Sequence, residues 1–413
     1  WMPTGNVSGA WNVHEESFFP KLKPLSSLTF RVSYSLTGTP PDASYCNALT
    51  KLSMNTPYRP TTTDKELGFV VAALGNDELT YEKKHEFNFG VDAGFFNNRL
   101  NVTFDVYQRR NFDEIAPTVT QLYGTAYANV GSMKSWGEEL SISSTNVKTN
   151  DFSWQTSLIY SHNRTEITNL YNQGRVIDLV QGNGFAKQGY PARALFSIPF
   201  VGINEKGNPV CINEKGQATV GDLNFQERNN TDYLIYEGST DPIYNGSLGN
   251  TFNYKGFHLN LFLTYAFGNV VRLDPVFKAK YNDLTSMNHD FKNRWMQPGD
   301  ENVTNVPGVV SRYEYEQNRT LLNTAYNAYN YTSVRTAKGD FIRLKEISLA
   351  YDFPHRWLEN SPVNNISLKL QATNLMLLYA DKKLNGQDPE FMNAGGVASP
   401  MPKQFTLTLK LGL

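Results

Sequence analysis

The sequence predicts an all-β protein, a transmembrane antiparallel β-barrel, and three observations support this fold class. Apolar and polar residues alternate with a period of two along many segments. The connections between these segments alternate between short and long. No run of about 18 apolar residues occurs, so we expect no membrane-spanning helix.

The clearest alternation lies in residues 256–270, where large apolar side chains occupy one face of the expected strand. These side chains are Phe257, Leu259, Leu261, Leu263, Tyr265 and Phe267. His258, Asn260 and Thr264 occupy the opposite face. An apolar face opposite a polar face is typical of a strand that separates lipid from a wet lumen.

The same pattern predicts eleven strands in the chain. They lie near residues 5–14, 27–37, 81–96, 98–111, 133–147, 151–165, 242–254, 256–270, 339–353, 363–378 and 403–413. In 339–353 the apolar positions change phase between Leu344 and Ile347. We therefore expect a β-bulge near Lys345-Glu346.

The connection lengths predict an orientation as well as a fold. Short connections fall at Asn97-Asn98, 148–150, Lys255-Gly256 and 354–362, and long ones at 38–80, 112–132, 166–241, 271–338 and 379–402. Because membrane barrels have short periplasmic turns and long extracellular loops, we expect the C-terminus in the periplasm.

An odd set of strands that begins outside and ends in the periplasm cannot close alone, since barrels of this kind have even strand numbers. We therefore expect residues 1–413 to be the C-terminal part of one barrel domain. An extra hairpin around Tyr190–Ile203 would leave this expectation unchanged.

Charge and cysteine content exclude several classes of protein. The net charge of -1 gives no electrostatic reason to expect nucleic acid as a partner. Cys46 and Cys211 lie in expected loops without metal-binding spacing, so we interpret them as incidental, with a disulfide between loops as the alternative.

The histidines also lack metal-binding spacing, so we expect no metal site and no cofactor. Asp283, Asp290 and Asp300 share one loop without an EF-hand pattern, and loop calcium is the alternative.

Several segments together resemble the SusC/RagA-like TonB-dependent transporters. The most extensive is residues 339–354, GDFIRLKEISLAYDFP, which is similar to the "RLKNITLGYTLP" strand of that family. Further similar segments are Trp11 with Glu15–Phe18, LTFRVSYSLTG at 28–38, 81–83 with 89–92, 98–100 with 105–107, 129–133 with 137–139, and Asn374-Leu375 with 388–390. The segments follow the family's order over nearly the whole chain.

The resemblance implies the C-terminal half of a barrel of about 22 strands, whose plug and N-terminal strands lie outside this chain. It implies TonB-dependent import of oligomeric nutrients, glycans or oligopeptides, across a Gram-negative outer membrane. The implied partners are a SusD-like surface lipoprotein acting as a lid, TonB through the N-terminal part, and membrane lipid. A dimer of such transporter–lipoprotein pairs is left open.

Polar-aromatic clusters in the long loops are the candidate substrate-binding residues, because flat aromatic faces beside amides suit sugar rings or peptide backbones. They are Tyr123, Tyr127, Trp295, Tyr326, Tyr329 and Tyr331. The alternative is packing among the loops or against a lid protein.

We expect no catalytic residue and no enzyme, since Asp388 and Glu390 lie in a loop motif without a sugar-cleaving context. The alternative functions are a non-transporting β-rich surface protein, such as a carbohydrate-binding protein or adhesin, and a surface glycosidase.

Overall fold

The computed structural model describes residues 2–19, 24–42, 49–56, 63–120, 124–171, 173–281, 287–359, 362–392 and 402–412. Within them, one antiparallel sheet of eleven strands dominates the fold, and we call it the wall sheet. Its strands are β1 (Gly5–Asn12), β2 (Leu25–Thr39), β5 (Glu82–Phe95), β6 (Leu100–Thr120), β7 (Gly124–Lys148), β8 (Phe152–Leu170), β14 (Tyr244–Tyr254), β15 (Phe257–Phe267), β18 (Phe341–Asp352), β19 (Asn365–Ala380) and β20 (Gln404–Gly412). The expected all-β class and all eleven expected strands are confirmed.

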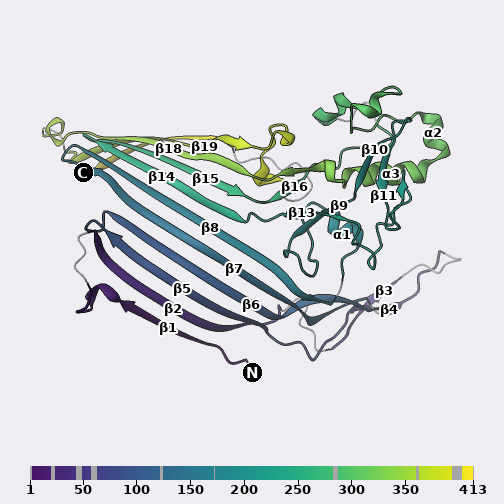
Figure 1. Cartoon of the computed structure of the whole chain (residues 1–413), viewed down its shortest axis with the longest axis horizontal. Coiled ribbons are helices and arrows are strands. Elements are labelled where there is room, and N and C mark those ends of the chain that lie inside the picture. Colours follow the sequence, from purple (N-terminus) through teal and green to yellow (C-terminus); the bar gives the residue numbers. More distant parts are fainter. Residues whose placement is uncertain are drawn as a thin grey trace.

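The strands of the wall sheet pair in chain order, so the sheet is an up-and-down meander. Figure 1 shows it as a curved wall with β1 near one edge and β18 and β19 near the other. The short turns and the C-terminus lie at one end of the strands, and the long connections lie at the other. At the short end, Lys255 and Gly256 adopt the positive φ angles of 44° and 88° that a two-residue hairpin turn requires.

The expected bulge in β18 is confirmed. Phe262 pairs with Glu346 and the next residue, Leu263, pairs with Leu344, so Lys345 has no partner across this ladder. The extra residue shifts the alternation by one position, which explains the change of phase in the sequence.

One sequence expectation is wrong. Residues 112–132 were expected to form a long connection, but β6 and β7 continue as paired arms to Thr120 and Gly124. A register irregularity after Asn111, with Asp113 at φ 57°, interrupts the alternation there.

The segment around Tyr190–Ile203, where an additional hairpin was left open, does not join the wall sheet. Instead, β9 (Ala194–Ser197) pairs with β13 (Ile235–Ser239), and β10 (Phe200–Ile203) pairs with β11 (Pro209–Ile212). Pro199, which lacks an N–H group, lies between β9 and β10.

The outer face of the wall sheet carries aromatic side chains in two bands. Near the short turns, Trp154 stacks on Phe252 at 5.7 Å and Phe257 lies 4.4 Å from Tyr351. Near the loops, Tyr160 stacks on Tyr244 at 6.3 Å and Phe267 lies 6.4 Å from Tyr379.

The two aromatic bands are about one membrane thickness apart. Tyr244 and Tyr254 begin and end β14, and their separation along the strand is roughly 33 Å at about 3.3 Å per residue. A strand tilt of about 40° reduces this to a height of about 25 Å, similar to the apolar band of outer-membrane barrels.

The inner face of the wall sheet is polar. Arg31 on β2 lies 2.6 Å from a carboxylate oxygen of Asp92 on β5 and 3.0 Å from Asp105 on β6. Such a cluster of charges needs water or other polar groups around it. The wall sheet therefore separates an apolar outer face from a wet inner face.

The long connections carry the smaller elements. These are β3 (Lys51–Asn55), β4 (Gly68–Ala73), β12 (Ala218–Thr219), β16 (Val270–Arg272), β17 (Thr336–Lys338), α1 (Val176–Val180), α2 (Arg312–Gln317) and α3 (Arg319–Asn330), besides β9, β10, β11 and β13. The 3-10 helices are Val13–Glu15, His289–Asn293, Asp300–Asn302, Ser333–Arg335, His355–Trp357, Lys382–Leu384 and Pro389–Phe391. No helix among the described residues is both long and apolar enough to cross a membrane.

Residues 173–243 and 268–340 fold together at the loop end of the wall sheet, and we call their described parts the loop unit. One hydrophobic cluster joins α1, β9, Cys211 of β11 and Ala328 of α3. A second joins Ala279 to the apolar side of α3. The loop unit therefore has a water-excluding core of its own.

Candidate functional site

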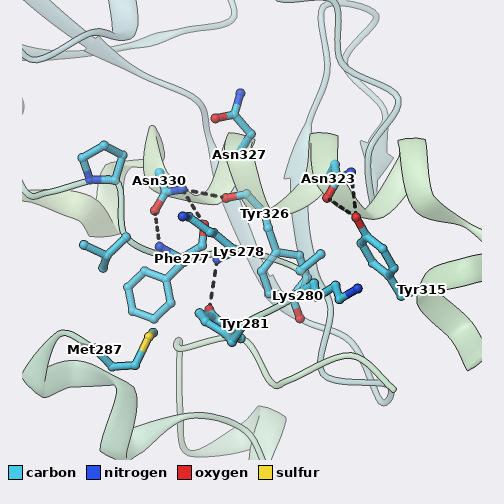
Figure 2. A pocket seen from close by; sticks show the side chains of 13 residues that line it. Phe277, Lys278, Lys280, Tyr281, Met287, Tyr315, Asn323, Tyr326, Asn327 and Asn330 are labelled. Atoms are coloured by element: carbon cyan, nitrogen blue, oxygen red, sulfur yellow. Dashed lines mark hydrogen bonds between the residues drawn. The ribbon is translucent and has the colours of Figure 1, made fainter. Parts of the chain in front are cut away.

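A pocket of about 670 Å³ opens in the loop unit between residues 275–281 and helix α3. Its walls combine rings, amides and lysines (Figure 2). The side chains that line it most prominently are Phe277, Lys278, Lys280, Tyr281, Met287, Tyr315, Asn323, Tyr326, Asn327 and Asn330.

The amphipathic sequence of α3 creates one wall of the pocket. Leu322, Ala325 and Tyr329 recur at helical spacing and are buried against the loop unit. Asn323 and Asn327, one helical turn apart, remain exposed and line the pocket. The helix therefore buries its apolar side and presents amide groups to the pocket.

The floor of the pocket is rigid and uncharged. The Tyr326 hydroxyl donates to the Gly308 carbonyl at 2.5 Å. The Asn330 amide donates to the Phe277 carbonyl at 2.9 Å and accepts from the Phe277 N–H at 3.1 Å. Burial raises the pKa of Tyr326, so its phenol stays neutral.

A fully buried arginine holds the loop unit together beside this pocket. Arg272 donates to the carbonyls of Phe196 at 2.6 Å, Thr332 at 2.8 Å and Val180 at 3.2 Å. It also donates to the Ser197 hydroxyl at 3.0 Å. Burial lowers the pKa of Arg272, and the oxygen acceptors offset the loss of water around the cation.

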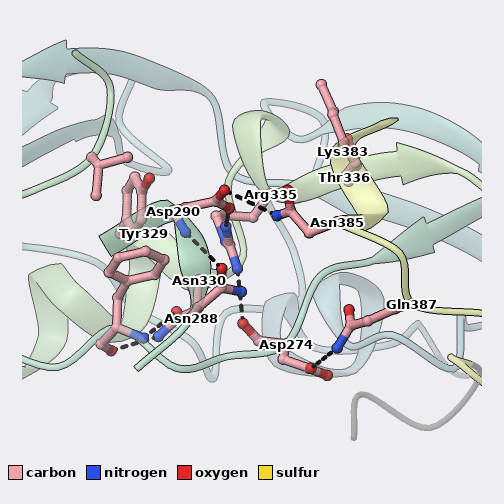
Figure 3. Close-up of polar contacts among 12 residues, drawn as sticks. Asp274, Asn288, Asp290, Tyr329, Asn330, Arg335, Thr336, Lys383, Asn385 and Gln387 are labelled. Carbon is pink, nitrogen blue, oxygen red and sulfur yellow. Dashed lines mark hydrogen bonds and ion pairs between the residues drawn. The ribbon is translucent and has the colours of Figure 1, made fainter. Parts of the chain in front are cut away.

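A second buried arginine connects the loop unit to the connection before β20 (Figure 3). Arg335 lies 3.2 Å from Asp290 and donates to the Asp274 carbonyl at 3.0 Å. From the other side, the Asn385 amide donates to Asp290 at 3.0 Å and the Gln387 amide donates to Asp274 at 3.2 Å.

The same connection is fixed to the wall sheet by Arg343 on β18. Its guanidinium lies 2.5 Å from Asp388 and 3.0 Å from Glu390. Arg343 and Asp388 are buried, whereas the Glu390 side chain is 43% exposed. Asp388 and Glu390 therefore act as an anchor for the loop.

The aromatic residues expected to contact substrate are dispersed, and some are buried. Tyr326 forms the pocket floor at 1% exposure, and Tyr329 is 2% exposed, 5.1 Å from Phe277. Both rings pack inside the loop unit, because the apolar side of α3 faces inward. For these two residues the structure favours the packing interpretation over direct substrate contact.

The remaining aromatic candidates do not line the pocket. The Trp295 ring nitrogen donates to Glu301 at 2.9 Å, Tyr331 packs 6.2 Å from Phe225, and Tyr127 lies on β7. Tyr123 lies outside the described residues. A substrate role for these four residues stays a prediction.

Six residues that line the pocket were not anticipated from the sequence as site residues. They are Lys278, Lys280, Tyr281, Tyr315, Asn323 and Asn327. The signal for α3 was present, since residues 322, 325, 326 and 329 follow helical spacing in the sequence. The expectation of one long loop over 271–338 left this helix out.

Cysteine and acidic residues add no further site. Cys211 is buried as a free thiol, and burial raises its pKa to about 12. Cys46 and Asp283 lie outside the described residues. Within the part that the structure describes, no group of three or more His, Cys, Asp or Glu side chains is placed to hold a metal ion.

Comparison with known proteins identifies relatives of one kind. The family model described as TonB dependent receptor-like, beta-barrel, matches residues 3–274. TonB-dependent receptor P3 of Formosa agariphila is 25% identical over 407 residues, which cover 94% of this chain and 38% of that protein. TonB-dependent receptor SusC of Bacteroides thetaiotaomicron is 24% identical over 440 residues, covering 100% of this chain and 40% of that protein.

Among solved structures, that of the RagAB peptide transporter matches with a TM-score of 0.77 and 24% identity. The match covers 98% of this chain and 43% of that chain, so it supports the fold. The chain thus spans about 40% of the length of the curated relatives it matches.

Proposed function

Because this chain belongs to the TonB dependent receptor-like β-barrel family, we propose that it is the C-terminal part of an outer-membrane importer of oligomeric nutrients, glycans or oligopeptides. The observation that carries the proposal is that the molecule consists of two different regions, the wall sheet and the loop unit. A wall sheet with an apolar outer face and a polar inner face supports a packed loop unit at one end only.

This division suits import rather than bond chemistry. The wall sheet supplies part of a wet channel, because its inner face carries ion pairs such as Arg31 with Asp92. The loop unit supplies a preformed surface for capture, because its rings and amides are held by buried hydrogen bonds. We propose that the loop end faces outward and that the C-terminus faces the periplasm.

The proposed transport cycle depends on partners beyond this chain. A SusD-like surface lipoprotein covers the loop end and traps the oligomer. A plug domain in the N-terminal part closes the channel until TonB displaces it. Residues of the wall sheet then line the route inward, and two transporter–lipoprotein pairs assemble as a dimer.

Substrate-dependent growth of the native host tests the proposal. Deletion of the gene should abolish growth on one class of oligomer, and the full-length gene should restore it. Depletion of TonB should have the same effect as the deletion. The full-length protein should also require detergent for extraction, because its outer face is apolar.

Unchanged growth on all glycans and peptides, together with release from cells without detergent, would contradict the proposal. That combination would favour the non-transporting surface protein instead. Hydrolysis of a glycan by the purified full-length protein would favour the glycosidase alternative.

A further inference from the structure

Among the described residues, the charges that line the α3 pocket are of one sign. Among its described lining residues, Lys278 and Lys280 are the charged ones, and no carboxylate lines it. Both lysines are exposed. Within the described ranges, neither ammonium group has a carboxylate oxygen within 4.0 Å.

Two acidic residues that flank the pocket residue Tyr315 do not neutralise these lysines. Glu316 lies 2.5 Å from Arg319, and this contact lowers the pKa of Glu316 most, with smaller contributions from Lys280 and Arg312. Glu314 lies 4.0 Å from Lys206. Among the described residues, the lip of the pocket is therefore positive even with these acidic residues included.

Beside the lysines, the pocket presents partly exposed rings and paired amides. Tyr281 and Tyr315 are half-buried, and the Lys280 ammonium lies 5.7 Å from the centre of the Tyr315 ring. Asn323 and Asn327 project from successive turns of α3 (Figure 2). Aromatic faces pack on the C–H side of a pyranose ring, and side-chain amides bond to its hydroxyl groups.

We propose that this pocket binds an acidic sugar unit, one bearing a carboxylate or sulfate group, within an oligosaccharide that the transporter imports. Lys278 and Lys280 pair with the acidic group, Tyr281 and Tyr315 contact the ring, and Asn323 and Asn327 bond to its hydroxyl groups. The inference rests on the proposed import function and narrows its substrate class.

The lining disfavours an oligopeptide in the same place. A peptide brings an N-terminal amine, which a binding site usually meets with a carboxylate. No carboxylate lines the described pocket, and two ammonium groups repel an amine. An acidic peptide remains an outcome that the experiment distinguishes.

Binding measurements on the full-length transporter in detergent test the inference. The probes are uronate oligosaccharides of several linkages, sulfated oligosaccharides, neutral oligosaccharides with the same backbones, and glutamate-rich peptides. Calorimetry should show binding of at least one acidic oligosaccharide and weaker binding of its neutral counterpart. The double substitution Lys278→Gln with Lys280→Gln should raise the dissociation constant of the acidic ligand by about tenfold or more.

Lys292→Gln is the matched control. This lysine is exposed in the same loop unit, lies 2.9 Å from His289 and does not line the pocket. The control should bind as the unaltered protein does. Since all three lysines are exposed, their replacement should leave folding unchanged.

The outcomes separate this inference from the proposed function. The acidic-sugar site would be overturned if no acidic oligosaccharide bound, or if neutral counterparts or glutamate-rich peptides bound more tightly. It would also be overturned if the double substitution had no effect on binding. Import of a neutral glycan or peptide in growth assays would still uphold the transporter. Loss of all import would instead reject the proposed function itself.

Discussion

In the wall sheet, apolar side chains such as Leu370 and Leu407 point outward and are 53% and 69% exposed, whereas Phe196 and Leu179 of the loop unit are 1% exposed. The wall sheet thus depends on lipid to cover its apolar groups, and the loop unit covers its own. A substitution in one region should therefore leave the other region largely unchanged. The predictions below use this contrast, from the largest expected effect to the smallest.

Arg272→Ala should be the most damaging change in the loop unit. It leaves buried oxygens of Phe196, Thr332 and Val180 without their donor, at a cost of about 4 kcal/mol or more. Hydrogen exchange should accelerate throughout the loop unit and stay unchanged in β14 and β15.

The control for Arg272 is Arg193→Ala. Arg193 is partly exposed and lies 2.7 Å from Asp241 at the surface. Arg193→Ala should change hydrogen exchange in the loop unit only slightly. Equal acceleration in both variants would contradict the special role of the buried Arg272. Loss of the wall sheet with Arg272→Ala would show that the two regions are not independent.

Asp388→Ala should release the connection before β20 from the wall sheet. It leaves the Arg343 guanidinium buried without its nearest carboxylate, and we expect a loss of about 3 kcal/mol. Proteolysis should then cleave the chain near residues 381–392. Glu390→Gln, which changes the exposed partner of Arg343, should stay resistant to proteolysis. Equal cleavage of both variants would contradict the role of Asp388 as an anchor.

Leu370→Lys should destabilise the wall sheet although the leucine is 53% exposed. A lysine facing lipid near the middle of a barrel strand costs about 2–4 kcal/mol. Gln371→Lys, the next residue on β19 and on the inner face, is the control. Thermal unfolding in detergent should separate the two variants, and equal stability would disprove the lipid-facing assignment.

The smallest effect is expected at α1. Bonds from the Arg175 guanidinium and N–H hold the pKa of Asp178 below its ordinary value. The pair therefore stabilises α1 above the unfolded pKa of about 3.9 and loses that contribution as the pH falls through the lower folded pKa.

Asp178→Asn tests this pH dependence. It should cost less than about 1 kcal/mol at neutral pH and should remove the acid sensitivity of hydrogen exchange in residues 176–180. Identical acid sensitivity in both proteins would show that another group is responsible. The wall sheet should not respond to the Asp178→Asn substitution.

The wall sheet was largely predictable from the sequence because the alternation within each strand shows which of its faces is apolar. Alternation at Phe257, Leu259 and Leu261 revealed β15, and the phase change around Lys345 revealed the bulge. The paired arms beyond Asn111 were missed, since the irregularity at Asp113 interrupts that signal.

The loop unit was not predictable in the same way because its contacts join distant segments. Nothing in the local sequence indicates that Arg272 donates to Val180, Phe196 and Thr332. Aromatic residues in the loops were expected as candidate substrate contacts. Their burial at Tyr326 and Tyr329 depends on which side of α3 faces inward, which no isolated tyrosine reveals.

The meander order of the wall sheet bears on how such proteins diversify. Because each strand pairs with its neighbours in the chain, an insertion between β15 and β18 changes a loop without changing any register in the wall sheet. Segments such as 268–340 can therefore be lengthened, shortened or replaced during evolution while the barrel wall is retained. A single scaffold can in this way acquire new ligand preferences when its loops are exchanged.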